Sequence, residues 1–251
     1  MLIRRNRAAL FLFIIALALT AMPAWASHRE EFHKSVPLEV NGDFSIKNVN
    51  GDIKIAGWDR NEVQIDAEKS ADSEEKLHEA RIEVFGSGHS VEVKTKYPDH
   101  SDNPARVEYT IHLPWGARVL DAATVNGSVH IDGPRGRIKA ETVNGKVEVW
   151  NAADEVELKS VNGDVSAAFK LAGKERVKLQ TVNGNASIAV PQSTNAHMKA
   201  ETVHGDIRSD LPVNVNRPKY GPGASVDSNL GSGGATIELQ TVNGSIYLHK
   251  S

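Results

Sequence analysis

The sequence predicts an all-β fold, a β-solenoid or β-helix-like stack, and three observations lead to it. A Thr-Val-Asn-Gly tetrapeptide or a close variant occurs six times from residue 124 onward. Its glycines are 18, 18, 21, 21 and 39 residues apart, and a period near 20 residues is typical of one coil of a stacked β-structure. Apolar and polar residues alternate around each copy, as in residues 138–149, which indicates half-buried strands.

Residues 1–26 are predicted to be a secretory signal peptide. Three arginines precede an apolar run at 8–22, and an Ala-Trp-Ala sequence of the kind that signal peptidase recognises follows it. The run is short for a helix that must cross about 30 Å of hydrocarbon, so we expect cleavage between Ala26 and Ser27 rather than anchoring. The remaining residues, 27–251, are expected to form a single domain that does not span a membrane.

Composition excludes some classes of partner. Residues 1–26 hold three of the 29 basic residues and no acid, so cleavage would change the net charge from −3 to −6, which argues against nucleic acid. The chain has no cysteine, so disulfides and thiol chemistry are excluded.

The elements before the repeats are predicted from local patterns. Early Val-Asn-Gly-Asp copies at 40–43 and 49–52 are each followed by alternating residues, which indicates strands. One short helix is expected within 71–80, where Asp72 or Ser73 can cap it and two glutamates suit its first turn. Strands are expected next at 81–85, 91–94 and 107–113, the last ended by a proline.

The repeat core is predicted at 118–251, with the Asn-Gly pair as the corner of each coil because both residues tolerate positive φ. A meander of Asn-Gly hairpins is the alternative, and the near-constant spacing favours the solenoid. The predicted corner residues are Asn126, Gly127, Asn144, Gly145, Asn162, Gly163, Asn183, Gly184, His204, Gly205, Asn243 and Gly244. Their asparagines are expected to pair along the stack, with His204 interrupting the column.

The valine before each corner is expected to point inward. Stacked coils would then form a buried column of Val125, Val143, Val161, Val182, Val203 and Val242. The doubled interval between the last two glycines contains residues 211–234, rich in Pro, Gly, Asn and Ser, which we interpret as a long loop.

The run Trp58-Asp59-Arg60-Asn61-Glu62-Val63, the strand at 107–114 and the serial corners followed by 233–239 together resemble a bacterial family. It is the "putative adhesin" family of β-strand-repeat proteins, and the likeness extends from about Val36 to Leu248. The resemblance implies a β-solenoid-like, non-catalytic envelope protein, and it supplies no set of binding residues.

No residue pattern predicts chemistry. The ten histidines are scattered without metal-binding spacing, so no catalytic residue, metal site or cofactor is expected. Acids after the corner glycines could bind calcium, although solvated turn residues are the favoured interpretation: Asp43, Asp52, Asp164 and Asp206. Glu141 and Glu201 share a repeat position, three coils or roughly 14 Å apart, which is too far for glycoside hydrolysis.

The sequence therefore predicts an exported, non-enzymatic envelope protein, an adhesin or a binding or scaffold module that presents a repetitive β-surface. We expect it in the periplasm, with the cell surface or secretion as alternatives. A polysaccharide-active β-helix enzyme and a periplasmic partner of an envelope signalling or stress-response protein are the other functions considered. The expected partner is an envelope glycan or protein, and the ligand-binding residues are unknown.

Two features could meet such a ligand. One is the column of hydroxyls at the first position of each tetrapeptide, although capping of the corners is the favoured role for them. The other is a set of tryptophans, Trp58, Trp115 and Trp150, for which packing is favoured over stacking on sugars.

Overall fold

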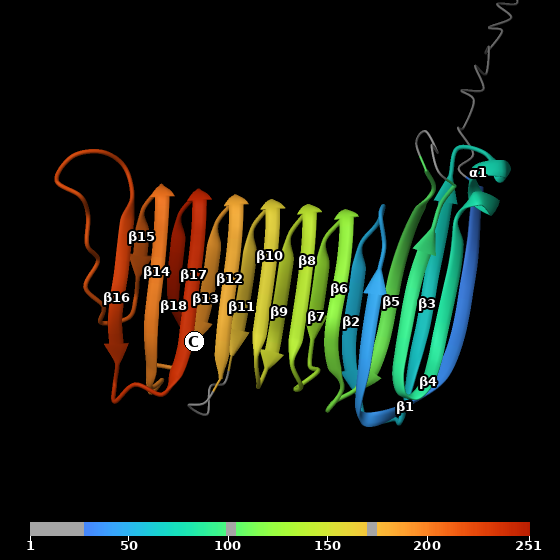
Figure 1. Ribbon diagram of the computed structural model, residues 1–251, viewed down its shortest axis with the longest axis horizontal. Helices are drawn as coiled ribbons and strands as arrows, with labels where there is room; N and C mark the ends of the chain where they lie inside the picture. The colour runs from blue at the N-terminus through green and yellow to red at the C-terminus, as the bar shows by residue number, and fades with distance from the viewer. Residues whose placement is uncertain (1–27, 99–103, 170–174) are drawn as a thin grey trace, which may run out of the picture.

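The computed structural model describes residues 28–98, 104–169 and 175–251, whose strands form two facing sheets of a flattened solenoid (Figure 1). Each coil contributes one strand to each sheet, and the Thr-Val-Asn-Gly tetrapeptides turn the chain from sheet B into sheet A. The predicted solenoid is confirmed, and within the described residues so is the one short helix. The predicted signal peptide and its cleavage site, Ala26 and Ser27, lie outside the described residues.

Sheet A has the strand order β1–β3–β5–β2–β7–β9–β11–β13–β18–β15, and its strands are parallel from β5 onward. Its strands are β1 (His28–Lys47, first half), β3 (Glu62–Ala71), β5 (Arg106–Pro114), β2 (Ile53–Trp58), β7 (Val129–Asp132), β9 (Val147–Ala152), β11 (Val165–Phe169), β13 (Ala186–Val190), β18 (Ile246–Lys250) and β15 (Ile207–Ser209).

Sheet B has the order β4–β1–β6–β8–β10–β12–β17–β14–β16, parallel except for β16. Its strands are β4 (Arg81–Lys96), the second half of β1, β6 (Arg118–Asn126), β8 (Ile138–Asn144), β10 (Val156–Asn162), β12 (Arg176–Asn183), β17 (Ala235–Asn243), β14 (Ala196–His204) and β16 (Ala224–Leu230).

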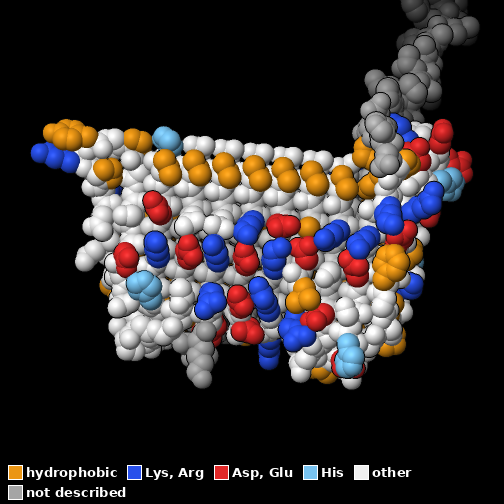
Figure 2. Space-filling view, in the orientation of Figure 1, with side chains coloured by type: hydrophobic (Ala, Val, Ile, Leu, Met, Phe, Trp, Pro, Cys, Tyr) orange, Lys and Arg blue, Asp and Glu red, His pale blue; other side chains and the backbone are white. Residues whose placement is uncertain are grey.

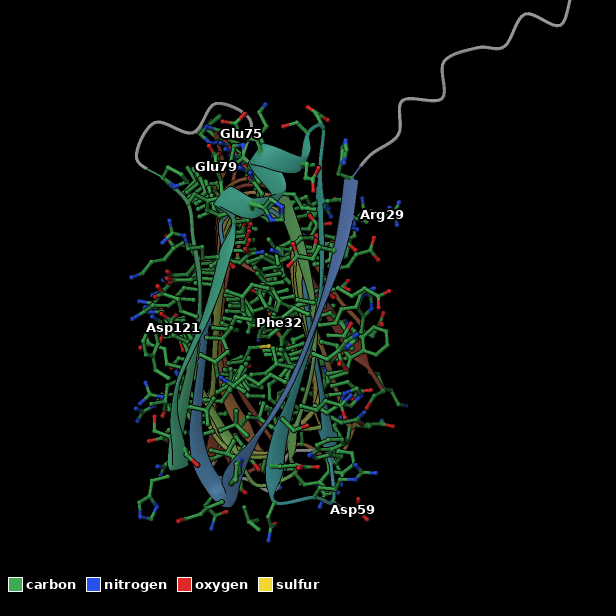
Figure 3. The ribbon with its side chains drawn as sticks, turned by 90° about the vertical axis from the view of Figure 1, so that its right-hand side faces the viewer. Arg29, Phe32, Asp59, Glu75, Glu79 and Asp121 are labelled. Carbon is green, nitrogen blue, oxygen red and sulfur yellow. The ribbon has the colours of Figure 1, made fainter. Side chains whose placement is uncertain are left out.

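The N-terminal end of the stack is covered by longer strands and the helix α1 (Glu74–Glu79), as Figure 3 shows along the stack. The Ser73 hydroxyl caps α1 by accepting from the Lys76 N–H at 3.3 Å. Lys69, 7% exposed, donates to the Ala80 carbonyl at the other end of the helix (3.3 Å) and pairs with Glu30 at 2.8 Å. These contacts hold the helix against β1 and β3 at one edge of that end (Figure 3).

The doubled interval has a topological cause. The last coil, β17–β18, lies between the coil of β12 and β13 and the coil of β14 and β15. These two coils, consecutive in the chain, are therefore not adjacent in the stack, and the C-terminal coil is inserted between them. Residues 211–234 are therefore not one loop: 224–230 form the antiparallel strand β16, which covers the C-terminal end of sheet B.

The expected buried valine column is wrong. All six valines are 38–47% exposed, and the hydroxyl residue before each one is buried instead. Each hydroxyl donates to the corner-glycine carbonyl of a neighbouring coil, as Thr142 Oγ1 does to Gly127 O at 2.8 Å. The other five donors are Thr124 to Gly51, Ser160 to Gly145, Thr181 to Gly163, Thr241 to Gly184 and Thr202 to Gly244.

The physical reason is the satisfaction of backbone polar groups. A carbonyl buried at a tight corner needs a donor, and an inward hydroxyl supplies one where a valine cannot. Strand alternation agrees with this arrangement, because Ile138, Ala140 and Thr142 share the inner face whereas Val143 lies on the outer face with Glu141.

Candidate functional site

The exposed valines form a straight apolar row on the outer face of sheet B, which we call the valine row (Figure 2). In spatial order it consists of Val125, Val143, Val161, Val182, Val242 and Val203. At about 4.8 Å per strand, the row is about 24 Å long. Because the strands are parallel and in register, every coil places its valine at the same height.

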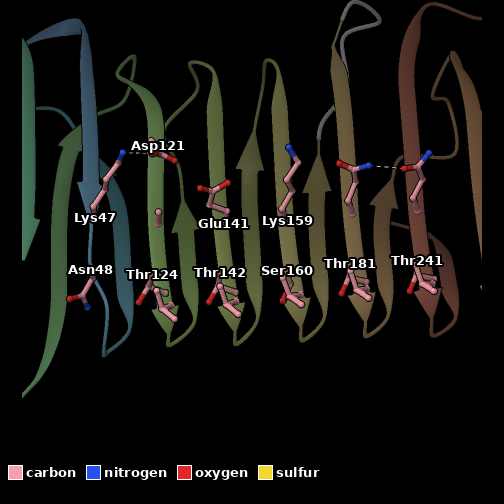
Figure 4. A pocket seen from close by; sticks show the side chains of 18 of the residues that line it. Lys47, Asn48, Asp121, Thr124, Glu141, Thr142, Lys159, Ser160, Thr181 and Thr241 are labelled. Atoms are coloured by element: carbon pink, nitrogen blue, oxygen red, sulfur yellow. Dashed lines mark hydrogen bonds and ion pairs between the residues drawn. The ribbon is translucent and has the colours of Figure 1, made fainter. Parts of the chain in front are cut away.

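A shallow groove of about 870 Å³ follows this row across the strands. The valines and the hydroxyl residues line the groove along one side. A row of longer side chains lines the other side (Figure 4). The flanking residues, here called the near row, are Glu141, Lys159, Gln180, Gln240, Glu201 and, outside the groove, Ser225 on β16.

The corner asparagines border the valine row on its other side and pair as predicted. Each Nδ2 donates to the Oδ1 of the preceding asparagine at 2.8–2.9 Å along the chain of neighbours Asn50, Asn126, Asn144, Asn162, Asn183 and Asn243. His204 does not interrupt this ladder but lies beyond Asn243 at its end, because β14 follows β17 in the sheet. The ladder gives the groove a rigid polar rim.

A second charged row lies two residues further from the valines, and its signs alternate along the sheet (Figure 2). This far row consists of Lys139, Glu157, Lys178, Glu238, Lys199 and Asp227. The insertion of β17 produces the alternation, since Glu238 separates Lys178 from Lys199. The hydrogen bond with Lys159 lowers the pKa of the Glu157 carboxyl, so the acid of this pair is ionised at neutral pH.

The corner acids already have partners. Asp43 pairs with Arg118 at 2.6 Å, and Asp52 accepts from the backbone N–H of Ser128 at 2.9 Å. Asp164 accepts from the Asn185 N–H, and Asp206 pairs with Arg217 at 2.8 Å. Each of these acids thus has a donor on one carboxylate oxygen, and the described residues contain no group of three potential metal ligands.

The two acids that share a repeat position lie farther apart than the repeat spacing suggested. Glu141 and Glu201 are four strands apart rather than three, because β17 adds a step, so about 19 Å separates them. Retaining and inverting glycosidases place their two carboxyl groups within about 10 Å.

The three tryptophans differ in their surroundings. Trp58 is packed, stacked on His112 and donating from its indole N–H to the Glu62 carbonyl at 2.9 Å. Trp115 and Trp150 are 42% and 47% exposed and contact Arg135 and His130. None of the three borders the valine row.

The sequence analysis did not predict the alternating charges of the far row, and it predicted the wrong direction for the valine side chains. Strict alternation from Ile138 onward would have revealed both, because it places Lys139, Glu141 and Val143 on one face. The position of β17 has no such local signal.

The Toastrack DUF4097 family model matches residues 19–249. Comparison with curated proteins found no match. Similar crystal structures include a "putative cell adhesion protein" from Clostridium sporogenes ATCC 15579, with 18% identity over 89% of this chain and 100% of that one and a TM-score of 0.47. Another is a "putative adhesin" from Bacteroides fragilis NCTC 9343, with 11% identity over 87% and 96% of the two chains and a TM-score of 0.33.

A third is a "putative lipid binding protein" from Parabacteroides distasonis ATCC 8503, with 10% identity over 88% and 96% and a TM-score of 0.32. Likeness at this level carries no argument about function. Among the described residues, no helix has the length and apolar character needed to cross a membrane.

Proposed function

The chain belongs to the Toastrack DUF4097 family, and from that premise we propose that it is an exported, non-enzymatic binding or scaffold module of the cell envelope. Its contacts are made through the valine row of sheet B. The observation that carries this proposal is the unbroken row of six half-exposed valines along a flat, rigid face. Contiguous exposed apolar surface on a folded domain is typical of an interaction site.

The repeats themselves support a role for the row. All six coils keep valine at this outward position, whereas the position two residues earlier varies among Ala, Glu, Lys and Gln. A solvent-exposed strand position accepts the β-branched polar residue Thr about as readily as Val, so folding alone does not require an apolar side chain there. Burial against a partner would recover about 25 cal/mol for each Å² of apolar surface.

The proposal is tested by co-sedimentation of residues 27–251 with envelope fractions and a polysaccharide panel, with released reducing ends assayed in the same tubes. The test variant is Val161→Asp, which places a charge in the middle of the row. The control is Ser187→Asp, at an outward position of sheet A.

We expect retention of the wild type and the control, loss of retention for Val161→Asp, and no reducing ends. Equal retention of all three proteins would move the contact to another surface. Release of reducing ends would replace the binding role with hydrolysis.

A further inference from the structure

The outer face of sheet B is complementary to itself. We propose that the partner of the valine row is a second copy of this chain, docked face to face with its stack reversed. This inference rests on the proposed function, because it names the occupant of the same surface. Closed two-fold contacts of this kind bury the same patch on both subunits.

The geometry follows from one symmetry axis. A two-fold axis parallel to the strands, passing between β12 and β17, turns sheet B over and reverses its strand order. Within the six strands from β8 to β16, each row of side chains then faces the same row of the second copy in reverse, whereas Val143 faces the start of β16 and Val125 on β6 lies beyond this face. In the valine row, Val182 meets Val242 of the second copy and Val161 meets Val203.

The far row matches in charge at every position under this operation. Its six residues alternate in sign and end on opposite charges, so reversal places each lysine opposite an acid. The three pairs, each formed twice, are Lys178 with Glu238, Glu157 with Lys199, and Lys139 with Asp227. Complementary charges across an interface fix its register and exclude wrong partners.

The near row supports the axis between β12 and β17. There Gln180 meets Gln240, and Lys159 meets Glu201 of the second copy. An axis moved by one strand to either side brings no opposite charges of the near row together. An axis between β10 and β12 would also pair valines and opposite far-row charges, so the Lys159–Glu201 pair is what selects the axis between β12 and β17.

The size and charge of the face also fit a second copy. The six strands from β8 to β16 share about seven residues each, which gives a face of about 29 Å by 23 Å. Each copy would contribute roughly 700 Å², close to the ~800 Å² per partner of a stable complex. Lysines and acids are nearly balanced on this face, which disfavours both a polyanion and a polycation as the occupant.

The test uses charge reversal at one cross-copy pair. Within one chain Lys159 and Glu201 lie three strands apart, about 14 Å, too far for an ion pair. A Lys159→Glu homodimer would place two acids together at both symmetric positions, and a Glu201→Lys homodimer would place two lysines together. A mixed dimer of the two variants would restore both pairs.

Sedimentation velocity of purified residues 27–251 would measure the dimer, with thermal melting as the check on folding. We expect a wild-type dimer, a dissociation constant raised about tenfold or more in each single variant, and recovery to near the wild-type value in the equimolar mixture. The dimers of both variants should weaken further with added salt, because they keep the charged pairs that the far row forms between the two copies. The sheet A control Ser187→Asp should dimerise normally.

A monomeric wild type, or a mixture no tighter than its components, would overturn the second copy as partner. The envelope assay separates this failure from failure of the proposed function. A monomer that is still retained through Val161 would keep the valine row as the contact surface with a different occupant. A charge-dependent dimer that envelope fractions do not retain would keep the self-contact and remove the envelope role.

Discussion

The Gln180 Nε2 donates a hydrogen bond of 2.6 Å to Gln240 Oε1, although 60 residues separate the two in the chain. They are neighbours because β17 lies between β12 and β14. The final coil of the chain is therefore an interior coil of the stack, and it contributes Val242 and Gln240 to the candidate binding face.

Removal of the last coil should prevent folding instead of shortening the stack. Deletion of residues 235–251 would leave β12 and β14 without their shared neighbour and would expose the core valines and leucines of both flanking coils. We expect loss of the β-sheet circular dichroism signal and aggregation. Replacement of residues 218–222, in the exposed loop before β16, by a short glycine linker is the control and should leave the spectrum unchanged. A folded, monodisperse truncation would contradict the strand order.

The inward hydroxyls should matter more than the valines that follow them. Thr142→Val keeps the shape of the side chain but leaves the buried Gly127 carbonyl without its 2.8 Å donor, at a cost of about 1–3 kcal/mol. Val143→Thr, at an outward position, should change stability by less than about 0.5 kcal/mol. Urea unfolding of both variants measures the difference. The reverse ranking would restore the inward valine column.

The corner glycines should resist even a methyl group. A Cβ on Gly145 would lie 2.0 Å from the Gly127 carbonyl oxygen of the adjacent coil, and because the clashing atoms are backbone they have little room to relax. We expect Gly145→Ala to cost more than about 2 kcal/mol by the overpacking mechanism. Lys146→Ala, at the next and exposed position, is the matched control. Similar melting temperatures for the two variants would show that the corners are looser than described.

The loop before β16 should be anchored in a pH-dependent way. Arg217 hydrogen-bonds to Asp206 and lowers the pKa of its carboxyl from the ordinary 3.8. A lowered folded pKa means that the anchor is fully present above the ordinary value and is lost as pH falls through the lower one. An NMR titration of the Arg217 Hε should therefore have its midpoint below 3.8, and Asp206→Asn should abolish the transition. A midpoint above 3.8 would refute the ion pair in solution.

Local patterns in the sequence were sufficient for most of the architecture. The spacing of the Asn-Gly corners predicted the coils, and the repeated asparagines predicted the ladder that links Asn126 to Asn243. The Ser73 cap and the two glutamates after it predicted α1. The corners and the ladder depend on contacts between identical positions of adjacent coils, and the helix depends on its own capping residues, so each could be predicted from a local pattern.

The direction of the valines was misjudged for a different reason. Apolar character suggested burial, but the inner face at the corner needs a hydrogen-bond donor, and only the threonine or serine can supply it. The alternation of Ile138, Ala140 and Thr142 contained the correct answer. The candidate site was therefore present in the sequence and was assigned to the wrong face.

The sequence by itself determined the coil, its corners and the rows of residues that repeat along the stack, because these follow from period-two alternation and from glycine at a close backbone contact. Only the tertiary structure decided the order of the coils. Parallel coils present nearly the same backbone edge to any neighbouring coil, so the local sequence pattern does not determine which coil is next to which. Long-range contacts do choose: direct pairing of β12 with β14 would bring Lys178 beside Lys199, whereas inserted β17 places Glu238 between them.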